Sequence, residues 1–237
     1  MTSGPPDRTL RELAEDLAER RPSRPRVVAV GGGVAVGKST VAAGLATALE
    51  AAGAGPVAVV ATDGYLLPNA ELAARGLTER KGFPESYDLP ALRELLRDVR
   101  AGEGPLRAPV YEHRLQDRVP DAAIVVDRPA TLVLEGLAAL DERIADLVDV
   151  AVYVDAAEEL AASWYLDRFR AWRIAAANDP GAFLHPLRDM PDADAEALAM
   201  RVWETVNLPN VRANVLPGRA RADVVLVKDV GHALRIG

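Results

Sequence analysis

The residues best placed to do chemistry lie in one short stretch near the start of the chain. The fixed positions of the pattern Gly-x-x-x-x-Gly-Lys-Ser are occupied by Gly32, Gly37, Lys38 and Ser39. The glycines allow backbone N–H groups to surround a phosphate chain, the lysine supplies a positive charge, and the serine hydroxyl can bind Mg²⁺. We therefore expect a nucleotide site formed by Gly32, Gly33, Val34, Ala35, Val36, Gly37, Lys38, Ser39 and Thr40.

The elements on either side of this stretch favour the nucleotide interpretation. Residues 27–30 are all apolar, which is typical of a central parallel strand buried on both faces. Residues 40–50 are rich in Ala and Leu and predict a helix, whose positive N-terminal end would point at the same anion. The alternative is a glycine-rich turn with no ligand. A buried strand before the pattern and a helix after it are the context that phosphate binding requires.

Two acidic residues follow predicted buried strands. Asp63 comes directly after the apolar run 57–62, and Glu135 follows the run 131–134. Ligands bind at the carboxyl ends of parallel strands. We expect the run 57–62 to neighbour the first strand through a right-handed crossover, so that Asp63 faces the γ-phosphate, and we expect Glu135 to hold Mg²⁺ or its water. Because glycine follows each acid, an ordinary turn is the alternative at both places.

A predicted helix in the second half of the chain supplies cations. The run 157–177 carries Arg168, Arg170 and Arg173 in its second half. Phosphoryl transfer needs positive charge on the migrating group, and arginines on a mobile helix can supply it. For each of the three, an exposed and ion-paired helix face is the alternative.

Three stretches are predicted to be irregular. Residues 66–88 combine several turn signals, and a loop of that length indicates a lid or binding loop. Residues 108–114 carry Tyr111 and His113. A single histidine is more often a surface or structural residue than a catalytic one, so its surroundings alone assign no role to His113. Residues 207–221 are predicted to be a polar irregular stretch.

The order of these elements predicts the fold class. Alternating strands and helices imply an α/β fold with a doubly wound, mainly parallel sheet. We expect residues 1–25 to form an N-terminal helix, with leucines on one face of the run 8–21, and residues 26–237 to form a single domain.

Composition excludes several classes of function. The 237 residues include no cysteine, which excludes disulfides, thiolate metal sites and a cysteine nucleophile. A net charge of −7 argues against a broad nucleic-acid or membrane surface. No apolar run is long enough to span a membrane, and residues 1–7 lack the pattern of a secretory signal. We therefore expect a cytoplasmic protein that binds neither nucleic acid nor membrane.

Six stretches together resemble one known family. They are GGGVAVGKST (31–40), TDGYLLPNAELAARGLTERKGFPESYD (62–88), APVYEHRLQDRVPD (108–121), LVLEGLAAL (132–140), YVDAAEELAASWYLDRFRAWR (153–173) and NVLPGRARADVVLVK (214–228). In order and spacing they are similar to the type I (bacterial) pantothenate kinases, in the phosphoribulokinase/uridine kinase branch of P-loop kinases. Many families share the phosphate-binding pattern, whereas GFPESYD together with APVYEH is specific.

The resemblance implies an activity and a set of roles. It implies a P-loop kinase domain with helical lid and acceptor-binding insertions, which phosphorylates pantothenate to 4′-phosphopantothenate with ATP and Mg²⁺ and is typically a homodimer. By this resemblance Asp63 is the catalytic base, Lys38 and Ser39 bind phosphate and Mg²⁺, and Glu135 lies near Mg²⁺. The residues implied at the acceptor site are Asp63, Tyr111, His113, Tyr165, Arg168 and Asn214, with Arg168 reaching towards the transferred phosphate.

The chain also departs from the family pattern. Family members have a longer segment before the phosphate loop. Gln116 replaces a tyrosine, Phe183 and Leu187 stand where the family has another aromatic pair, Ala43 replaces an arginine linked to inhibition by coenzyme A, and Gly218 replaces a threonine. Two alternatives therefore stay open: a related kinase for another small alcohol, such as a nucleoside or a sugar, and a nucleotide-binding regulator with little turnover. The combination of two acids and an arginine argues against the regulator.

Overall fold

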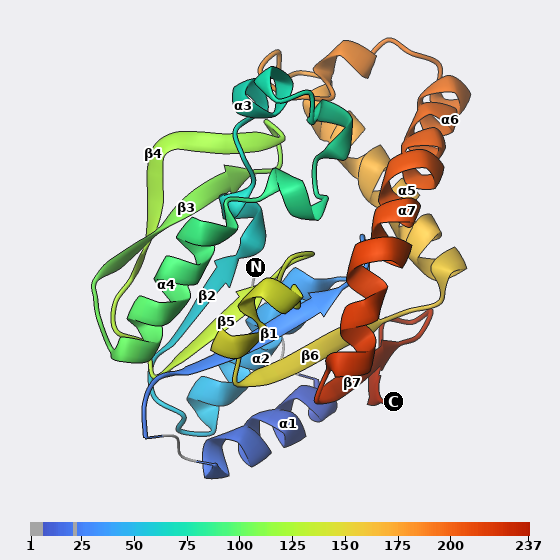
Figure 1. The fold of residues 1–237 in the computed structure, drawn as a ribbon. Helices are drawn as coiled ribbons and strands as arrows, with labels where there is room; N and C mark the ends of the chain where they lie inside the picture. Colours follow the sequence, from blue (N-terminus) through green and yellow to red (C-terminus); the bar gives the residue numbers. More distant parts are fainter. Residues whose placement is uncertain (1–6, 21–22) are drawn as a thin grey trace.

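A six-stranded sheet forms the centre of the molecule. The computed structural model describes residues 7–20 and 23–237 (Figure 1). The sheet has the order β2-β5-β1-β6-β7-β8, and all neighbours are parallel except β7 and β8. Its strands are β1 (Arg26–Gly32), β2 (Val57–Ala61), β5 (Thr131–Glu135), β6 (Val150–Asp155), β7 (Val224–Lys228) and β8 (Leu234–Ile236). The predicted α/β fold with a mainly parallel sheet is confirmed.

Helices cover both faces of the sheet, as the term doubly wound implies. The helices are α1 (Arg8–Glu19), α2 (Lys38–Ala51), α3 (Asn69–Ala74), α4 (Leu89–Ala101), α5 (Glu158–Ala176), α6 (Asp192–Val202) and α7 (Leu208–Asn210). The leucines of α1 and α2 pack in one buried cluster and those of α4 in another. The helix predicted over 8–21 is α1, which ends at Glu19. Its leucines pack in the same core as the sheet.

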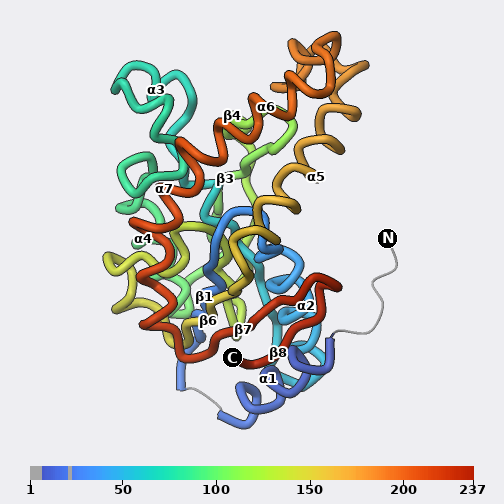
Figure 2. Tube along the Cα trace, turned by 90° about the vertical axis from the view of Figure 1, so that its right-hand side faces the viewer, coloured from blue at the N-terminus to red at the C-terminus, as the bar shows by residue number. Residues whose placement is uncertain are grey.

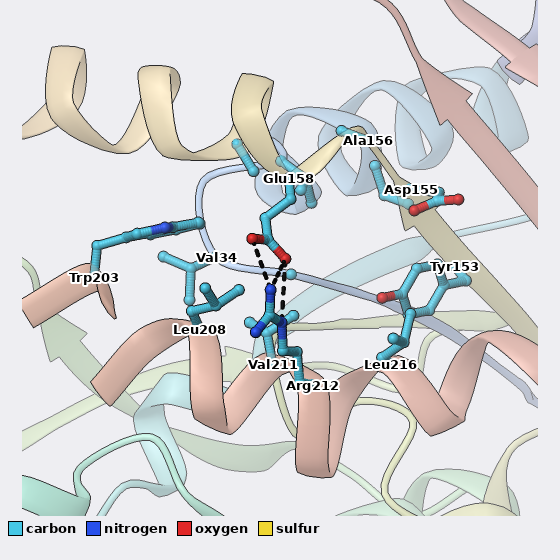
Figure 3. Close-up of a pocket in the computed structure, with 14 residues that line it drawn as sticks. Val34, Tyr153, Asp155, Ala156, Glu158, Trp203, Leu208, Val211, Arg212 and Leu216 are labelled. Atoms are coloured by element: carbon cyan, nitrogen blue, oxygen red, sulfur yellow. Dashed lines mark hydrogen bonds and ion pairs between the residues drawn. The ribbon is translucent and has the colours of Figure 1, made fainter. Parts of the chain in front are cut away.

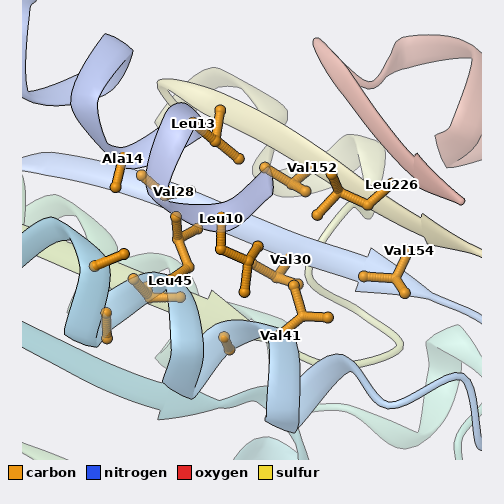
Figure 4. Packing of buried hydrophobic residues seen from close by; sticks show 14 of the residues in the cluster. Leu10, Leu13, Ala14, Val28, Val30, Val41, Leu45, Val152, Val154 and Leu226 are labelled. Atoms are coloured by element: carbon orange, nitrogen blue, oxygen red, sulfur yellow. The ribbon is translucent and has the colours of Figure 1, made fainter. Parts of the chain in front are cut away.

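Strand β1 connects the two clusters. Val28 and Val30 belong to the cluster beneath α1 and α2, shown in Figure 4. Val27 and Ala29 belong to the cluster on the opposite face. Successive side chains of a strand point to opposite faces, so a central strand needs apolar residues at every position. This is why residues 27–30 of β1 are all apolar.

The position of β2 differs from the expectation. The run 57–62 was expected to neighbour the first strand, but β5 pairs with both β1 and β2 and lies between them. Burial gives the reason. Every residue of β5 is buried, whereas most of β2 is only half-buried. The fully buried strand β5 occupies the inner place, and the less buried β2 lies at the edge of the sheet.

The stretch 108–114 is not irregular, and this expectation was wrong. β3 (Leu106–Glu112) pairs antiparallel with β4 (Asp117–Val126) in a separate two-stranded sheet. Pro109 obscured the strand because proline cannot donate a ladder hydrogen bond. The register shifts between Pro109 and Tyr111, so the strand accommodates the proline at an irregularity.

The stretch 207–221 is likewise not irregular but helical. Sequence rules end a helix before a proline such as Pro209, because proline lacks an N–H and its ring clashes with the preceding turn. Here two π-helical turns, Trp203–Asn207 and Val211–Val215, flank the short α7 that contains Pro209. The wider turns let the chain stay helical from α6 to Arg221.

Two parts of the chain extend beyond the carboxyl edge of the sheet. One carries α3, and the other is the pair α5 and α6 (Figure 2). These two parts, together with the antiparallel pair β3 and β4, surround the carboxyl edge of the sheet (Figure 1). No helix among the described residues is both long and apolar enough to cross a membrane.

Candidate active site

The phosphate loop joins β1 to α2 at the carboxyl edge of the sheet. Gly37, with φ of 86°, is the N-cap of α2 and offers no side chain to the N–H groups of the first turn. These N–H groups and the helix dipole favour a bound anion. Ala35 also has a positive φ, 65°. Such a conformation costs energy in a residue with a Cβ and is common at ligand sites.

Lys38 lies between this loop and two acids. Its Nζ donates to the carbonyl oxygen of Gly33 across 2.7 Å. Burial lowers the pKa of Lys38 to about 8, although Glu135 and Asp63 act in the opposite direction. A half-buried amine with a single carbonyl partner among the described residues is well suited to receive phosphate oxygens.

Glu135 is the last residue of β5 and lies next to the phosphate loop. Its Oε1 accepts a hydrogen bond of 2.9 Å from Ser39 Oγ. Burial raises the pKa of Glu135, Asp63 adds to the shift, and Lys38 and Ser39 oppose it. Hydroxyl and carboxylate oxygens are ligands that Mg²⁺ accepts. The described residues hold no cluster of three or more His, Cys, Asp or Glu fit for a metal, so a magnesium ion here would depend on phosphate oxygens and waters for its other ligands.

Asp63 follows β2 in a short 3-10 turn, Thr62–Tyr65. The next residue explains why the loop can approach β3. A Cβ on Gly64 would lie 2.2 Å from the carbonyl oxygen of Pro109, so only glycine fits there. This close approach brings the turn that carries Asp63 against the strand that carries Tyr111.

The three arginines of α5 have different environments. Arg168 is half-buried, its Nε is fully buried with no partner among the described residues, and its guanidinium lies 4.8 Å from the ring centre of Trp172. Burial lowers its pKa, while Tyr165 and Asp63 oppose the shift. Arg170 is exposed and binds Glu196 at 2.7 Å. Arg173 binds backbone carbonyls of the following loop. Of the three, Arg168 is the one with a buried guanidinium nitrogen that has no partner among the described residues, which suits it to receive a ligand.

Aromatic rings connect this arginine to β3. The rings of Tyr111 and His113 lie 5.2 Å apart, and His113 stacks on Trp172 at 5.6 Å. Trp172 in turn lies under the guanidinium of Arg168. The arrangement joins two predicted acceptor residues, Tyr111 and His113, to the predicted phosphate-binding arginine, although His113 itself is exposed.

Tyr165 and Asn214 lie differently with respect to this site. The Tyr165 ring is 5.3 Å from that of Trp203, and burial raises the pKa of Tyr165 against the influence of Arg168 and a hydrogen bond with Asn207. Asn214 is exposed, and the structure does not bring it into the group formed by the other predicted residues. Its Nδ2 donates to Asn210 across 2.9 Å.

Several residues in these contacts were absent from the sequence prediction. Trp172 follows Arg168 by four positions, one helical turn, and that spacing could have indicated it. Lys81 lies 5.1 Å from the ring centre of Tyr111, and its rarity in an arginine-rich chain was a signal. Asn207 and Asn210 carried none, because their stretch was predicted to be irregular.

The departures from the family pattern lie mostly at the periphery. Ala43 is exposed on α2, and Phe183 is 59% exposed. Leu187 packs beside Phe169 in a small cluster between α5 and α6. Gly218 packs against Leu140.

A pocket of about 210 Å³ lies beside the phosphate loop (Figure 3). Gly33, Val34 and Val36 of the phosphate loop are among the residues that line it, and Trp203 lies at one end. Arg212 reaches across it to Glu158 with hydrogen bonds of 2.9 to 3.2 Å. None of the predicted acidic, aromatic or arginine residues of the acceptor site lines this pocket.

The fold and the phosphate loop define the class. A mainly parallel sheet whose first strand runs into a Gly-Lys-Ser loop and helix is that of the P-loop kinases. The phosphoribulokinase / uridine kinase family matches residues 27–179, which is more than half of the chain, and the chain belongs to that family.

Individual relatives extend the comparison over most of the chain. A protein of Chelativorans sp. named pantothenate kinase is 42% identical over 223 residues, which cover 89% of this chain and 70% of the relative. A pantothenate kinase of Corynebacterium diphtheriae is 45% identical over 221 residues, which cover 91% of this chain and 72% of the relative.

Solved structures agree on the fold. D-glycerate 3-kinase from Cryptococcus neoformans has a TM-score of 0.68 at 14% identity, and the similarity covers 95% of this chain and 94% of that one. Phosphoribulokinase from Rhodobacter spheroides has a TM-score of 0.52 at 15% identity, covering 87% and 71%. At these identities the similarity concerns the fold alone.

Proposed function

We propose that this protein transfers the γ-phosphoryl group of ATP to the primary hydroxyl of pantothenate, giving 4′-phosphopantothenate and ADP. The observation that carries the proposal is the 42% to 45% identity with pantothenate kinases over about nine-tenths of the chain. The geometry supports it, because Glu135, Asp63 and Arg168 all lie close enough to Lys38 to act on its pKa, and Ser39 is hydrogen-bonded to Glu135 at the same edge of the sheet.

The transfer step assigns each of these residues a task. Asp63 orients the acceptor hydroxyl and takes its proton as the oxygen attacks the γ-phosphorus in line. The bond from the γ-phosphorus to the bridging oxygen breaks, and ADP leaves with that oxygen. Lys38 and Arg168 stabilise the negative charge on the transferred group. The phosphate loop holds the remaining phosphates with backbone N–H groups.

Ser39 and Glu135 would hold the magnesium ion that accompanies ATP. Their oxygens already face each other across 2.9 Å. When bound, the ion neutralises charge on the β- and γ-phosphates.

The proposed acceptor pocket is formed by Tyr111, His113, Tyr165 and Arg168, with Asn214 as a further residue implied by the family. Tyr111 and Tyr165 are half-buried, so each can present a hydroxyl together with an apolar ring. Pantothenate offers hydroxyl, amide and carboxylate groups to such a wall. We also propose that the protein is cytoplasmic and, on family resemblance, a homodimer.

A second candidate acceptor is another small alcohol, such as a nucleoside or a sugar. The observation that favours it is the altered pocket: Gln116 replaces a tyrosine, and Phe183 is 59% exposed and outside the aromatic row. Phosphoryl transfer would use the same residues for any acceptor.

Mass spectrometry of the reaction product tests the proposal. Purified protein is incubated with Mg·ATP and pantothenate, and the expected product is pantothenate heavier by one phosphoryl group. Unchanged pantothenate after prolonged incubation would refute the assigned acceptor. ADP formed with another alcohol would identify the second candidate, and no ADP with any alcohol would leave a nucleotide-binding regulator.

A further inference from the structure

Gln116 occupies the turn between β3 and β4, at the end of the acceptor wall. Its φ is 51°, an uncommon value for a residue with a Cβ. Its side chain makes two hydrogen bonds. Tyr111 Oη donates to Gln116 Oε1 at 3.2 Å, and Gln116 Nε2 donates to the carbonyl oxygen of His113 at 2.8 Å.

These two contacts fix the direction of the Tyr111 hydroxyl. A backbone carbonyl can only accept, so the nitrogen of the Gln116 amide must face His113 and the oxygen must face Tyr111. The single O–H of Tyr111 is then donated to Gln116. Only the lone pairs of the Tyr111 oxygen remain for a ligand, and they accept hydrogen bonds.

The backbone of Gln116 also makes hydrogen bonds, with residues of the segment 66–88. The carbonyl oxygen of Gln116 accepts from Asn69 Nδ2 at 3.1 Å and also from Lys81 Nζ. Lys81 donates in addition to Asn69 Oδ1 at 2.7 Å. Gln116 therefore connects the β3–β4 turn to the segment 66–88 and holds Lys81 beside the Tyr111 ring.

We propose that Gln116 is a positioning residue that determines acceptor specificity through Tyr111. With its O–H donated to Gln116, Tyr111 selects acceptors that place an O–H or N–H donor at this point and rejects a carboxylate there, which has no proton to donate. The inference rests on the proposed function in one respect: it takes the acceptor to bind beside Tyr111.

A double-mutant cycle tests the coupling between the two residues. Gln116→Met keeps the length of the side chain and removes both hydrogen bonds, and Tyr111→Phe removes the hydroxyl. Each variant is expected to lower kcat/KM for the acceptor by about tenfold, because each loses the hydrogen bond that orients the Tyr111 hydroxyl, with KM for ATP unchanged. The double variant is expected to fall no further than Tyr111→Phe alone. Val125→Thr, exposed on the same hairpin, is the control and should match wild type.

One outcome of the cycle would contradict the inference. If the two losses multiply to about a hundredfold, Gln116 acts independently of Tyr111 and the inference is wrong. The cycle is run with whichever alcohol the wild-type protein phosphorylates best, so a failure with pantothenate overturns the proposed function and leaves the cycle intact.

A second measurement needs no acceptor at all. The same four proteins are unfolded with urea in the absence of ligands. A coupling of about fivefold in the unfolding equilibrium constant is expected for a single hydrogen bond between positions 111 and 116. Additive effects on unfolding would show that the hydroxyl is not held by Gln116 and would overturn the inference.

Discussion

The Ser39 hydroxyl donates a hydrogen bond of 2.9 Å to Glu135, although 96 positions separate the two residues in the sequence. The contact follows from the strand order, because β5 is the direct neighbour of β1. The phosphate loop at the end of β1 therefore lies beside the acid at the end of β5. This adjacency supports the proposed magnesium site.

Asp63→Asn tests the proposed base. The amide cannot accept the proton of the acceptor hydroxyl, so kcat is expected to fall by roughly two or more orders of magnitude. KM for ATP should stay near the wild-type value, because the phosphate loop is untouched. Steady-state ADP release measures both. Asp189→Asn, at a side chain that is 82% exposed, is the control, and near-normal turnover of Asp63→Asn would remove Asp63 from the mechanism.

Arg168 and Arg170 form a matched pair on one helix. Arg168→Ala is expected to lower kcat by about a hundredfold or more, because a preorganised cation on the transferred group is lost. Arg170→Ala removes an exposed ion pair with Glu196, and such solvent-screened pairs contribute little to stability. Its kcat should stay within about twofold of wild type. Equal losses in the two variants would contradict the assignment of the transfer role to Arg168.

Asn210 and Asn214 form a second matched pair. Asn210 is 3% exposed, and its Nδ2 donates to the carbonyl oxygen of Gly82 at 2.7 Å. Asn210→Ala leaves that carbonyl without its partner and should lower the unfolding free energy by about 1 to 3 kcal/mol. It should also raise KM for the acceptor, because Gly82 belongs to the segment that carries Lys81.

Asn214→Ala separates an indirect role from direct contact. Asn214 is exposed and bonds only to Asn210 among the described side chains. If Asn214 acts through Asn210, its removal should have the smaller effect on stability and on acceptor KM. A larger rise in acceptor KM than Asn210→Ala causes would show that Asn214 binds the acceptor itself. Urea unfolding and acceptor titration measure the two quantities.

Asp149 makes the free energy of unfolding depend on pH. It accepts a hydrogen bond of 2.9 Å from the Val27 N–H and pairs with Arg24 at 2.6 Å. Burial acts to raise its pKa, but these hydrogen bonds prevail and hold the pKa below its usual value. The folded pKa is thus lower than the unfolded one, so the contribution is present above the unfolded pKa of about 3.9 and is lost as pH falls through the folded pKa.

Denaturant unfolding at several pH values between about 3 and 7 checks this dependence. Asp149→Asn is expected to be less stable than wild type at pH 7 by about 1 to 3 kcal/mol. The difference should shrink as the pH approaches the lower end of the range. A difference that stays constant over the whole range would contradict the account.

The parts of the fold that were predicted share one property. β1, β2, β5, β6 and β7 are short apolar runs, and the phosphate loop has a local sequence pattern, so neighbouring residues carry the signal. The place of β2 at the edge depends on burial by distant elements. The β3 strand and the helix through Pro209 depend on an irregular register and on π-helical turns, which local rules treat as breaks.

The same division applies to the site. The sequence indicated Lys38, Asp63 and Glu135 because each follows a strand at the binding edge. Residue types alone did not distinguish Arg168 from Arg170, which differ in what packs against them, and only the family resemblance singled out Arg168. The carbonyl oxygen of Gln116 accepts from Asn69 and Lys81, which lie 47 and 35 positions earlier in the chain, so no local pattern contains these contacts.

The most direct test of the central claim is ADP release by the purified protein with Mg·ATP, with pantothenate compared against uridine, cytidine and common sugars. Pantothenate is expected to stimulate ADP release far above the other alcohols. Stimulation by a nucleoside or a sugar, with none by pantothenate, would contradict it.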